Sequence, residues 1–257
     1  MKVAVAGKGG SGKTTIAAVL ARSLARTGHR VLAIDADPNP CLAVSLGVPR
    51  EEGQRLAPLP GDLLVQRIEP GGERRMELTM TPHQIGERFG LRAPDGVILV
   101  SMGGVDHAGT GCNCAGHATV RAILENADGD DDLITVTDME AGLEHLKRGT
   151  PRHADVMLMV MEPYYKSLET AVRVAALASE LGIPRVYAVA NKIRGADDET
   201  VIKEVCDRQG LKLIGSVPYD EVVVEAQRSG AAPMDIDGNS PAVRRIAQIA
   251  GRLESGG

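Results

Sequence analysis

The stretch that constrains this chain most is a glycine-rich loop directly after its first apolar run. Residues 3–6 are apolar, and the positions from Gly7 to Thr14 match the spacing G-x-x-x-x-G-K-[ST]. Apolar residues then recur at spacings of three and four, which predicts a helix that begins near Lys13. The order of strand, loop and helix is the context that a phosphate-binding loop requires. We therefore predict a nucleotide-binding α/β fold.

Each fixed position of this loop has a chemical task. Glycines let backbone N–H groups turn toward phosphate oxygens, and the helix N-terminus adds a partial positive charge. We expect Lys13 to reach the β- and γ-phosphates and the Thr14 hydroxyl to bind Mg²⁺. The alternative is a glycine-rich turn that binds nothing. The predicted nucleotide-binding residues of the loop are Gly9, Gly10, Ser11, Gly12, Lys13, Thr14 and Thr15.

Composition limits the classes of function. The 257 residues, 43% hydrophobic, suit a single α/β domain over 1–257 that contains the phosphate loop. Aromatic residues make up only 2%, which argues against a base-stacking platform for single-stranded nucleic acid. A net charge of −5 argues against non-specific DNA binding. We find no signal peptide and no membrane-length apolar run, so we expect a cytoplasmic protein without a nucleic-acid or membrane partner.

Alternating strand and helix patterns predict a doubly wound, mainly parallel sheet of seven or eight strands. Residues 47–96 contain six prolines, and we interpret them as an elaboration of the same domain. Within it we expect a strand at 62–68 and a helix in 76–89. The other predicted strands are 30–34, 97–100, 133–137, 155–161, 186–190 and 211–217. The other predicted helices include 118–125, 168–181 and 241–253.

Carboxylates follow two of these strands, at the sheet edge where α/β folds bind ligands. Asp138 ends the apolar strand 133–137, which is the Walker B pattern, and it is expected to hold Mg²⁺ through water. Asp37 follows strand 30–34 and precedes a proline. It is a candidate to orient the attacking water, because that water needs an acceptor on the side away from the γ-phosphate. The alternative is that Asp37 only caps the next helix.

A polar motif follows the strand at 186–190. Asn191, Lys192, Ile193 and Arg194 are similar to the base-reading motif N-K-x-D, with arginine in the acidic position. Aspartate there accepts from the guanine N1–H and N2–H groups, which arginine cannot do. The motif therefore favours adenine, with Asn191 as the base contact, and predicts ATP and ADP as the nucleotides.

A pair of cysteines, Cys112 and Cys114, lies in a glycine-rich stretch before a predicted helix. Two thiolates supply half of a tetrahedral soft-metal site, and a dimer would supply four. We predict one divalent metal ion per dimer, held at the dimer interface by two thiolates from each subunit, and Zn²⁺ suits such a tetrahedral site. The alternatives are two buried small residues in a turn or a redox-active pair.

A second lysine in the loop, Lys8, makes it resemble the deviant Walker A loop of the MinD/ParA-type ATPases, which include the nitrogenase iron protein. The resemblance implies the P-loop NTPase fold of that type. It also implies that Lys8 acts catalytically by reaching across a homodimer to the partner's nucleotide. Asp37 falls at that family's switch I aspartate and Gly142 at its switch II glycine. Pro218 falls in its second base-edge loop.

The two cysteines, the run 138–142 and the Glu162-Pro163 pair make the chain similar to the carbon monoxide dehydrogenase maturation ATPases of the CooC type. That resemblance implies a slow, dimer-dependent ATPase that binds nickel. It also implies a client, a nickel–iron–sulfur enzyme such as carbon monoxide dehydrogenase or acetyl-CoA synthase. Two other readings stay open: an iron–sulfur ATPase like the nitrogenase iron protein, since four thiolates could hold a cluster, and a MinD/ParA-type positioning ATPase.

Overall fold

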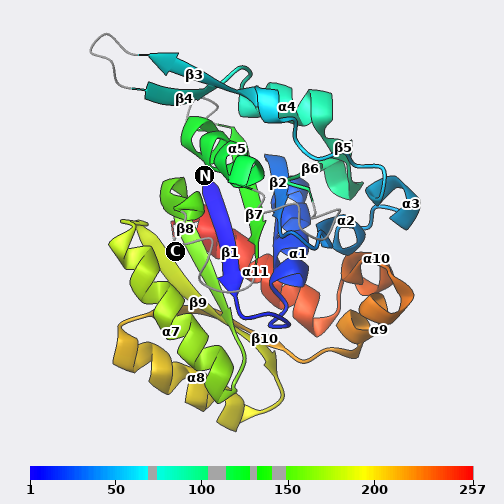
Figure 1. Ribbon diagram of the computed structural model, residues 1–257. Coiled ribbons are helices and arrows are strands. Elements are labelled where there is room, and N and C mark those ends of the chain that lie inside the picture. Colours follow the sequence, from blue (N-terminus) through cyan, green and yellow to red (C-terminus); the bar gives the residue numbers. More distant parts are fainter. Residues whose placement is uncertain (69–73, 104–113, 128–131, 141–148, 257) are drawn as a thin grey trace.

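An eight-stranded sheet forms the centre of the computed structural model of this protein (Figure 1). Its strand order is β10-β9-β8-β1-β7-β2-β6-β5, and every neighbouring pair is parallel except β5 with β6. The predicted doubly wound, mainly parallel sheet is confirmed. The structure describes residues 1–68, 74–103, 114–127, 132–140 and 149–256. The strands of the sheet are β1 (Lys2–Gly7), β2 (Arg30–Ala36), β5 (Leu91–Arg92), β6 (Ile98–Ser101), β7 (Leu133–Met139), β8 (Val156–Met161), β9 (Arg185–Ile193) and β10 (Lys212–Pro218).

Helices cover both faces of the sheet, because successive strand side chains point to opposite sides. On β1, Val3 and Val5 pack in a cluster with α1 and α11, whereas Ala4 and Ala6 pack in a cluster with α7 and α8. A third cluster joins α4 and α5 to β2. All three clusters are almost wholly aliphatic, as the low aromatic content requires. The helices of eight or more residues are α1 (Lys13–Arg26), α4 (Pro82–Phe89), α5 (Cys114–Asn126), α7 (Tyr165–Glu180), α8 (Ala196–Gln209), α9 (Glu221–Ser229) and α11 (Pro241–Glu254).

Short elements fill the connections. The segment predicted as an elaboration contains a separate antiparallel pair, and its first strand confirms the strand expected at 62–68. Whether the whole chain is one domain stays a prediction. The short elements are α2 (Leu42–Ser45), α3 (Arg50–Gly53), η1 (Gly61–Leu63), β3 (Leu64–Ile68), β4 (Arg74–Leu78), η2 (Pro94–Gly96), η4 (Thr150–His153) and α10 (Pro233–Asp237).

The helix expected within 76–89 is confirmed as α4, and the predicted start of α5 is wrong. The helix expected in 76–89 begins only at Pro82, because the residues before it pair as β4 with β3. Thr81 and Gln84 form a capping box, in which each side chain accepts a hydrogen bond from the other residue's backbone N–H. The helix α5 begins at Cys114, four residues before the predicted start at Ala118.

None of the helices in the described part of the chain combines the length and the apolar character needed to cross a membrane.

Candidate functional site

The predicted phosphate loop joins β1 to α1 at the carboxyl edge of the sheet (Figure 1). The spacing of this loop has a steric reason at two glycines. A Cβ on Gly7 would collide with the carbonyl oxygen of Val160 on β8. Gly12 is the N-cap of α1 with a φ of 94°, in the left-handed region, and a Cβ there would collide with the Asn191 amide. The loop therefore packs too closely on the neighbouring strand ends for side chains at these positions.

The N-terminus of α1 is arranged to receive an anion. No side chain caps it, and its first turn contains no acidic residue. The N–H donors and the positive end of the helix dipole therefore have no negative counterpart in that turn. Lys13 is only 6% exposed, and its Nζ lies 3.4 Å from the Lys8 carbonyl oxygen, across the loop. The Ser11 hydroxyl is buried and has no hydrogen-bond partner in the described part of the chain.

Two carboxylates lie side by side next to this loop. Asp35 on β2 is directly opposite Asp138 on β7 in the parallel register, and both are buried. Burial raises the pKa of Asp138 to about 7, although a hydrogen bond with the Thr14 side chain acts to lower it. Burial likewise raises the pKa of Asp35 to about 6, against hydrogen bonds from the Leu42 and Asp37 backbone. Two buried acids that are hard to ionise indicate a place for a compensating cation.

The residues fit Mg²⁺. The structure brings Thr14 and Asp138, which the sequence predicted separately, into hydrogen-bond contact. The second carboxylate oxygen of Asp138, Oδ1, is buried without a hydrogen-bond partner among the described residues. Hydroxyl and carboxylate oxygens are the ligands, direct or through water, that Mg²⁺ takes beside a nucleotide.

Asp35 has a role that the sequence analysis missed. Its carboxylate accepts hydrogen bonds from the backbone N–H of Asp37, at 3.2 Å, and of Leu42, at 2.9 Å. It therefore ties both ends of the loop 37–42 to the sheet. The sequence signal for this role was the D-x-D spacing of Asp35 and Asp37 at the end of a strand, because it places two carboxylates where the loop begins.

The loop itself excludes one alternative for Asp37. Its Oδ1 accepts from the Asn39 N–H at 2.9 Å, in a turn that precedes α2 by several residues. The N-cap of α2 is Cys41, and the Leu42 N–H is bonded to Asp35, so the idea that Asp37 caps this helix is wrong. The role of Asp37 in orienting water stays a prediction.

The predicted base-binding residues converge on a narrow cleft of about 50 Å³. Asn191 and Pro218, from the ends of β9 and β10, line it together with Gly12 and Thr15 of the loop. The Asn191 Nδ2 group donates to the Ser11 carbonyl oxygen at 2.7 Å, so it also supports the loop. Its contact with adenine stays a prediction.

Arg194, at the position of the missing aspartate, packs on the wall of this cleft. Its guanidinium carbon lies 3.6 Å from the centre of the Tyr219 ring, a cation–π distance. The ring belongs to the residues that line the cleft. A donor-only side chain held there offers no acceptor for guanine N–H groups.

A larger cavity of about 1,090 Å³ opens beside the phosphate loop. Lys13, Thr14 and Asp35 line one side of it. Residues of the elaboration, from Arg50 to Pro58, line another side. Part of the segment whose role the sequence left open is therefore a wall of the site.

The predicted cysteine metal site lies largely outside the described residues. Cys112 and Gly142 lie outside the described residues, and Cys114 is described only as the first residue of α5. In the described part, Cys41 is exposed and Cys206 is buried. Burial, followed by the nearby Asp35 carboxylate, raises the pKa of the Cys41 thiol. No group of three or more His, Cys, Asp or Glu residues in the described ranges is placed to hold a metal ion.

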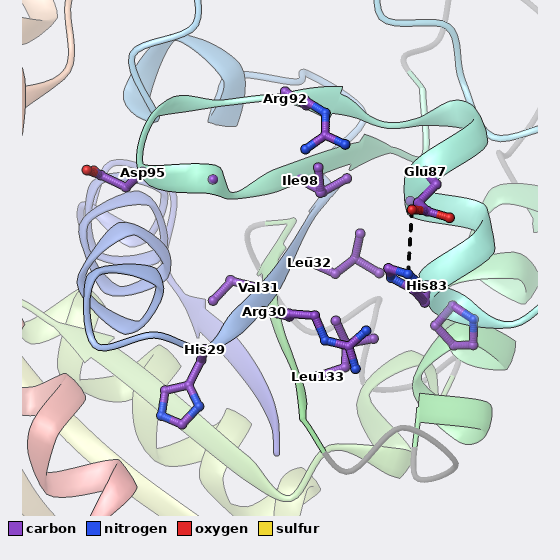
Figure 2. Close-up of a pocket in the computed structure, with 13 residues that line it drawn as sticks. His29, Arg30, Val31, Leu32, His83, Glu87, Arg92, Asp95, Ile98 and Leu133 are labelled. Atoms are coloured by element: carbon purple, nitrogen blue, oxygen red, sulfur yellow. Dashed lines mark ion pairs between the residues drawn. The ribbon is translucent and has the colours of Figure 1, made fainter.

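A separate cavity of about 260 Å³ lies at the amino ends of β2, β6 and β7 and against α4. Figure 2 shows the residues that line it. His83 and Glu87 form an ion pair on its rim, 3.6 Å apart. Ligands of open α/β sheets bind at the carboxyl ends of the strands. None of the predicted site residues that the structure describes lines this cavity, so it is not part of the nucleotide site.

Comparison with known proteins agrees with this geometry. Residues 2–234 match the family model described as the CobQ/CobB/MinD/ParA nucleotide binding domain. The carbon monoxide dehydrogenase accessory protein CooC of Rhodospirillum rubrum is 39% identical over 95% of this chain and 92% of its own length. An uncharacterised ATP-binding protein of Methanocaldococcus jannaschii is 36% identical over 97% and 96%.

A solved structure supports the fold. The septum site-determining protein MinD of Pyrococcus horikoshii, complexed with Mg-ADP, superposes with a TM-score of 0.72 over 98% of this chain and 95% of that protein, at 19% identity. At that identity the likeness shows the fold alone. The family is shown by the matching family model and by the two relatives with 39% and 36% identity. The chain therefore belongs to the CobQ/CobB/MinD/ParA nucleotide-binding family, as an ATPase similar to the carbon monoxide dehydrogenase accessory protein CooC.

Proposed function

We propose that this protein is an ATP-dependent, dimeric metallochaperone that binds nickel and assists its insertion into a nickel–iron–sulfur enzyme such as carbon monoxide dehydrogenase. The observation that carries the proposal is the 39% identity to the accessory protein CooC over 95% of the chain. The nucleotide site described above supports the ATP-dependent part of it. The nickel-dependent part rests on the Cys112-x-Cys114 pair and on the name of that relative.

In this proposal the chain's own groups divide the work on ATP. The loop N–H groups and the Lys13 ammonium bind the β- and γ-phosphates. Thr14, with Asp138 behind it, would hold Mg²⁺, which supplies charge neutralisation when it is bound. Asp37 orients the attacking water by accepting its proton in a hydrogen bond. Asn191 and Pro218 form the edge against which adenine binds.

Two variants test this division. Lys13→Ala is expected to lose ATP binding, because the loop loses its cationic partner for the phosphates. Asp37→Ala is expected to bind ATP like the wild type and to lose hydrolysis. Asp62→Ala removes an exposed carboxylate elsewhere and is the control. Calorimetry and phosphate release measure the two steps, and ATP binding by Lys13→Ala at wild-type affinity would contradict the assignment.

Lys8 is proposed to contact the nucleotide of the second subunit. A phosphate loop needs only Lys13, and Lys8 lies partly exposed at the start of the loop. If ATP is shared between two chains, its binding energy favours the dimer. Sedimentation with a non-hydrolysable ATP analogue should show a dimer for the wild type and a monomer for Lys8→Ala, with Lys203→Ala as the control. Equal dimerisation of Lys8→Ala and the wild type would remove Lys8 from the mechanism.

The cysteine pair is proposed to hold one nickel ion per dimer, with two thiolates from each subunit. Nickel here is cargo, and Zn²⁺ should compete for the same four sulfurs. Anaerobic titration of reduced protein should give half an ion per chain, lost in Cys112→Ser and in Cys114→Ser and retained in Cys41→Ser. Visible absorption of the protein as purified anaerobically would instead indicate an iron–sulfur cluster.

The decisive experiment uses the client. Nickel-free carbon monoxide dehydrogenase is incubated with the nickel-loaded protein and ATP, and CO oxidation is followed. Activity should appear with the wild type and should be absent with Lys13→Ala or Cys112→Ser. Equal activation by all three proteins would show that the nickel reaches the enzyme without this ATPase.

A further inference from the structure

Two consecutive residues at the end of β9 hold two consecutive carbonyl groups of the phosphate loop. Asn191 donates to the Ser11 carbonyl oxygen at 2.7 Å, and the Lys192 ammonium donates to the Gly10 carbonyl oxygen at 2.6 Å. The second bond is charge-assisted, but the Lys192 side chain is 39% exposed, so solvent weakens this bond relative to a buried one of the same kind. Lys192 therefore contacts a loop that is 182 positions away in the chain.

The Lys192 ammonium is braced by a second contact. Its Nζ lies 2.9 Å from Oε1 of Glu162, the residue that follows β8. The Glu162 side chain is only 11% exposed, and its backbone N–H donates to the Ser167 hydroxyl at the start of α7. Lys192 also has a φ of 58°, in the left-handed region that a lysine rarely adopts. Such a conformation persists only where the surroundings hold it, and the Lys192 side chain has two such contacts.

These contacts decide which groups the loop presents. A peptide unit is planar and trans, so its C=O and N–H groups point in opposite directions. With the Gly10 carbonyl bonded to Lys192, the Ser11 N–H points the other way and donates to the Lys8 carbonyl at 3.1 Å. Gly9 and Gly10 bring backbone freedom to this turn, and a rotated peptide would present a carbonyl oxygen to the phosphates.

We propose that Lys192, braced by Glu162, is a positioning residue for polyphosphate binding, because it fixes the Gly10–Ser11 peptide in the orientation that the loop needs. The proposal rests on the nucleotide site of the proposed function and is independent of nickel and of the client. Lys192 also borders the base cleft, so a contact with adenine is the competing role.

The test separates these roles by comparing two ligands. Binding of a non-hydrolysable ATP analogue and of inorganic tripolyphosphate, each with Mg²⁺, is measured by calorimetry for the wild type and for Lys192→Met. Loss of this exposed, charge-assisted hydrogen bond, which orders the loop, should weaken both ligands by the same factor, about tenfold. In ATP hydrolysis KM should rise, whereas kcat should stay within about threefold of the wild-type value, because the loop contacts the phosphates before and during the reaction. Weakened ATP binding with unchanged tripolyphosphate binding would assign Lys192 to the base instead.

Two further variants exclude other causes. Lys192→Met alone removes the cation that pairs with the Glu162 carboxylate, so the double variant Lys192→Met/Glu162→Gln restores the local charge balance. It should stay as weak as the single variant, and recovery to within about threefold of the wild type would overturn the proposal. Lys192→Arg keeps the positive charge and the N–H donors, so it should recover at least half of the binding free energy that Lys192→Met loses. Lys203→Met, on the exposed face of α8, is the control. A wild-type protein that binds neither ligand would refute the proposed function, whereas only differences among the variants bear on Lys192.

Discussion

Replacement of Asp138 by asparagine should stabilise the protein in the absence of nucleotide and Mg²⁺, and more at high pH than at low pH. Asp138 is 1% exposed, and burial raises its pKa from 3.8 to about 7. The folded protein therefore binds a proton at this carboxyl more tightly than the unfolded chain does. The stability that this proton provides is fully present below pH 3.8 and is lost as the pH rises through about 7. Asparagine has nearly the same shape and no charge to bury.

The magnitude follows from the two pKa values. One pKa unit corresponds to about 1.36 kcal/mol. At about pH 5.5 the unfolded-state carboxyl is ionised and the folded one is not, a difference of roughly 1.7 units or about 2 kcal/mol. At about pH 8.5 the whole gap of roughly 3 units counts, about 4 kcal/mol. The free energy of unfolding of Asp138→Asn relative to the wild type should therefore grow by about 2 kcal/mol between these pH values.

The assay is urea denaturation of both proteins with EDTA at the two pH values. Besides burial, the nearby Asp35 carboxylate also raises the pKa of Asp138, so the two carboxyls titrate together. The predicted increase of the stability difference with pH therefore belongs to the pair. Asp197→Asn, which removes an exposed charge on α8, measures the general effect of losing one negative charge. A difference between Asp138→Asn and the wild type that is the same at both pH values would refute the reasoning. So would an Asp138→Asn protein that is less stable than the wild type at the higher pH.

Two more predictions concern the frame of the site. Arg22 is 3% exposed and pairs with two carboxylates, those of Asp95, 2.6 Å from its Nε, and Asp235. Arg22→Met should therefore lower the free energy of unfolding by about 3–5 kcal/mol in urea denaturation. Arg26→Met, at a half-exposed contact with Asp95, should lower it by less than about 1 kcal/mol. A cost for Arg22→Met as small as that for Arg26→Met would contradict this. Gly12→Ala should weaken ATP binding at least about tenfold, because both its φ and its contact with a side-chain amide forbid a Cβ. Gly28→Ala has a similar φ and open space, so calorimetry should show loss of stability without loss of affinity.

The sequence by itself determined the local elements and their chemistry. The loop from Gly7 to Thr14 indicates phosphate binding from sequence alone, because the motif, the strand before it and the helix after it are contiguous in the chain. The alternating apolar patterns predicted the parallel sheet for the same reason, since side-chain periodicity is set by the backbone of a single segment. The pairing of β4 with β3 confines the helix expected within 76–89 to the part from Pro82 onward, which the sequence alone did not show.

Only the tertiary structure decided which distant groups act together. That Asp35, and not Asp37, ties the loop 37–42 to the sheet depends on the position of Leu42 after the chain has turned back. The contacts of Asn191 and Lys192 with the phosphate loop join residues about 180 positions apart. These contacts form because a single strand, β8, separates β9 from β1 in the sheet. The wall formed by residues 50–58 has the same origin. Strand order and loop packing follow from the burial of whole faces against one another, a balance of many weak contacts that no short pattern records.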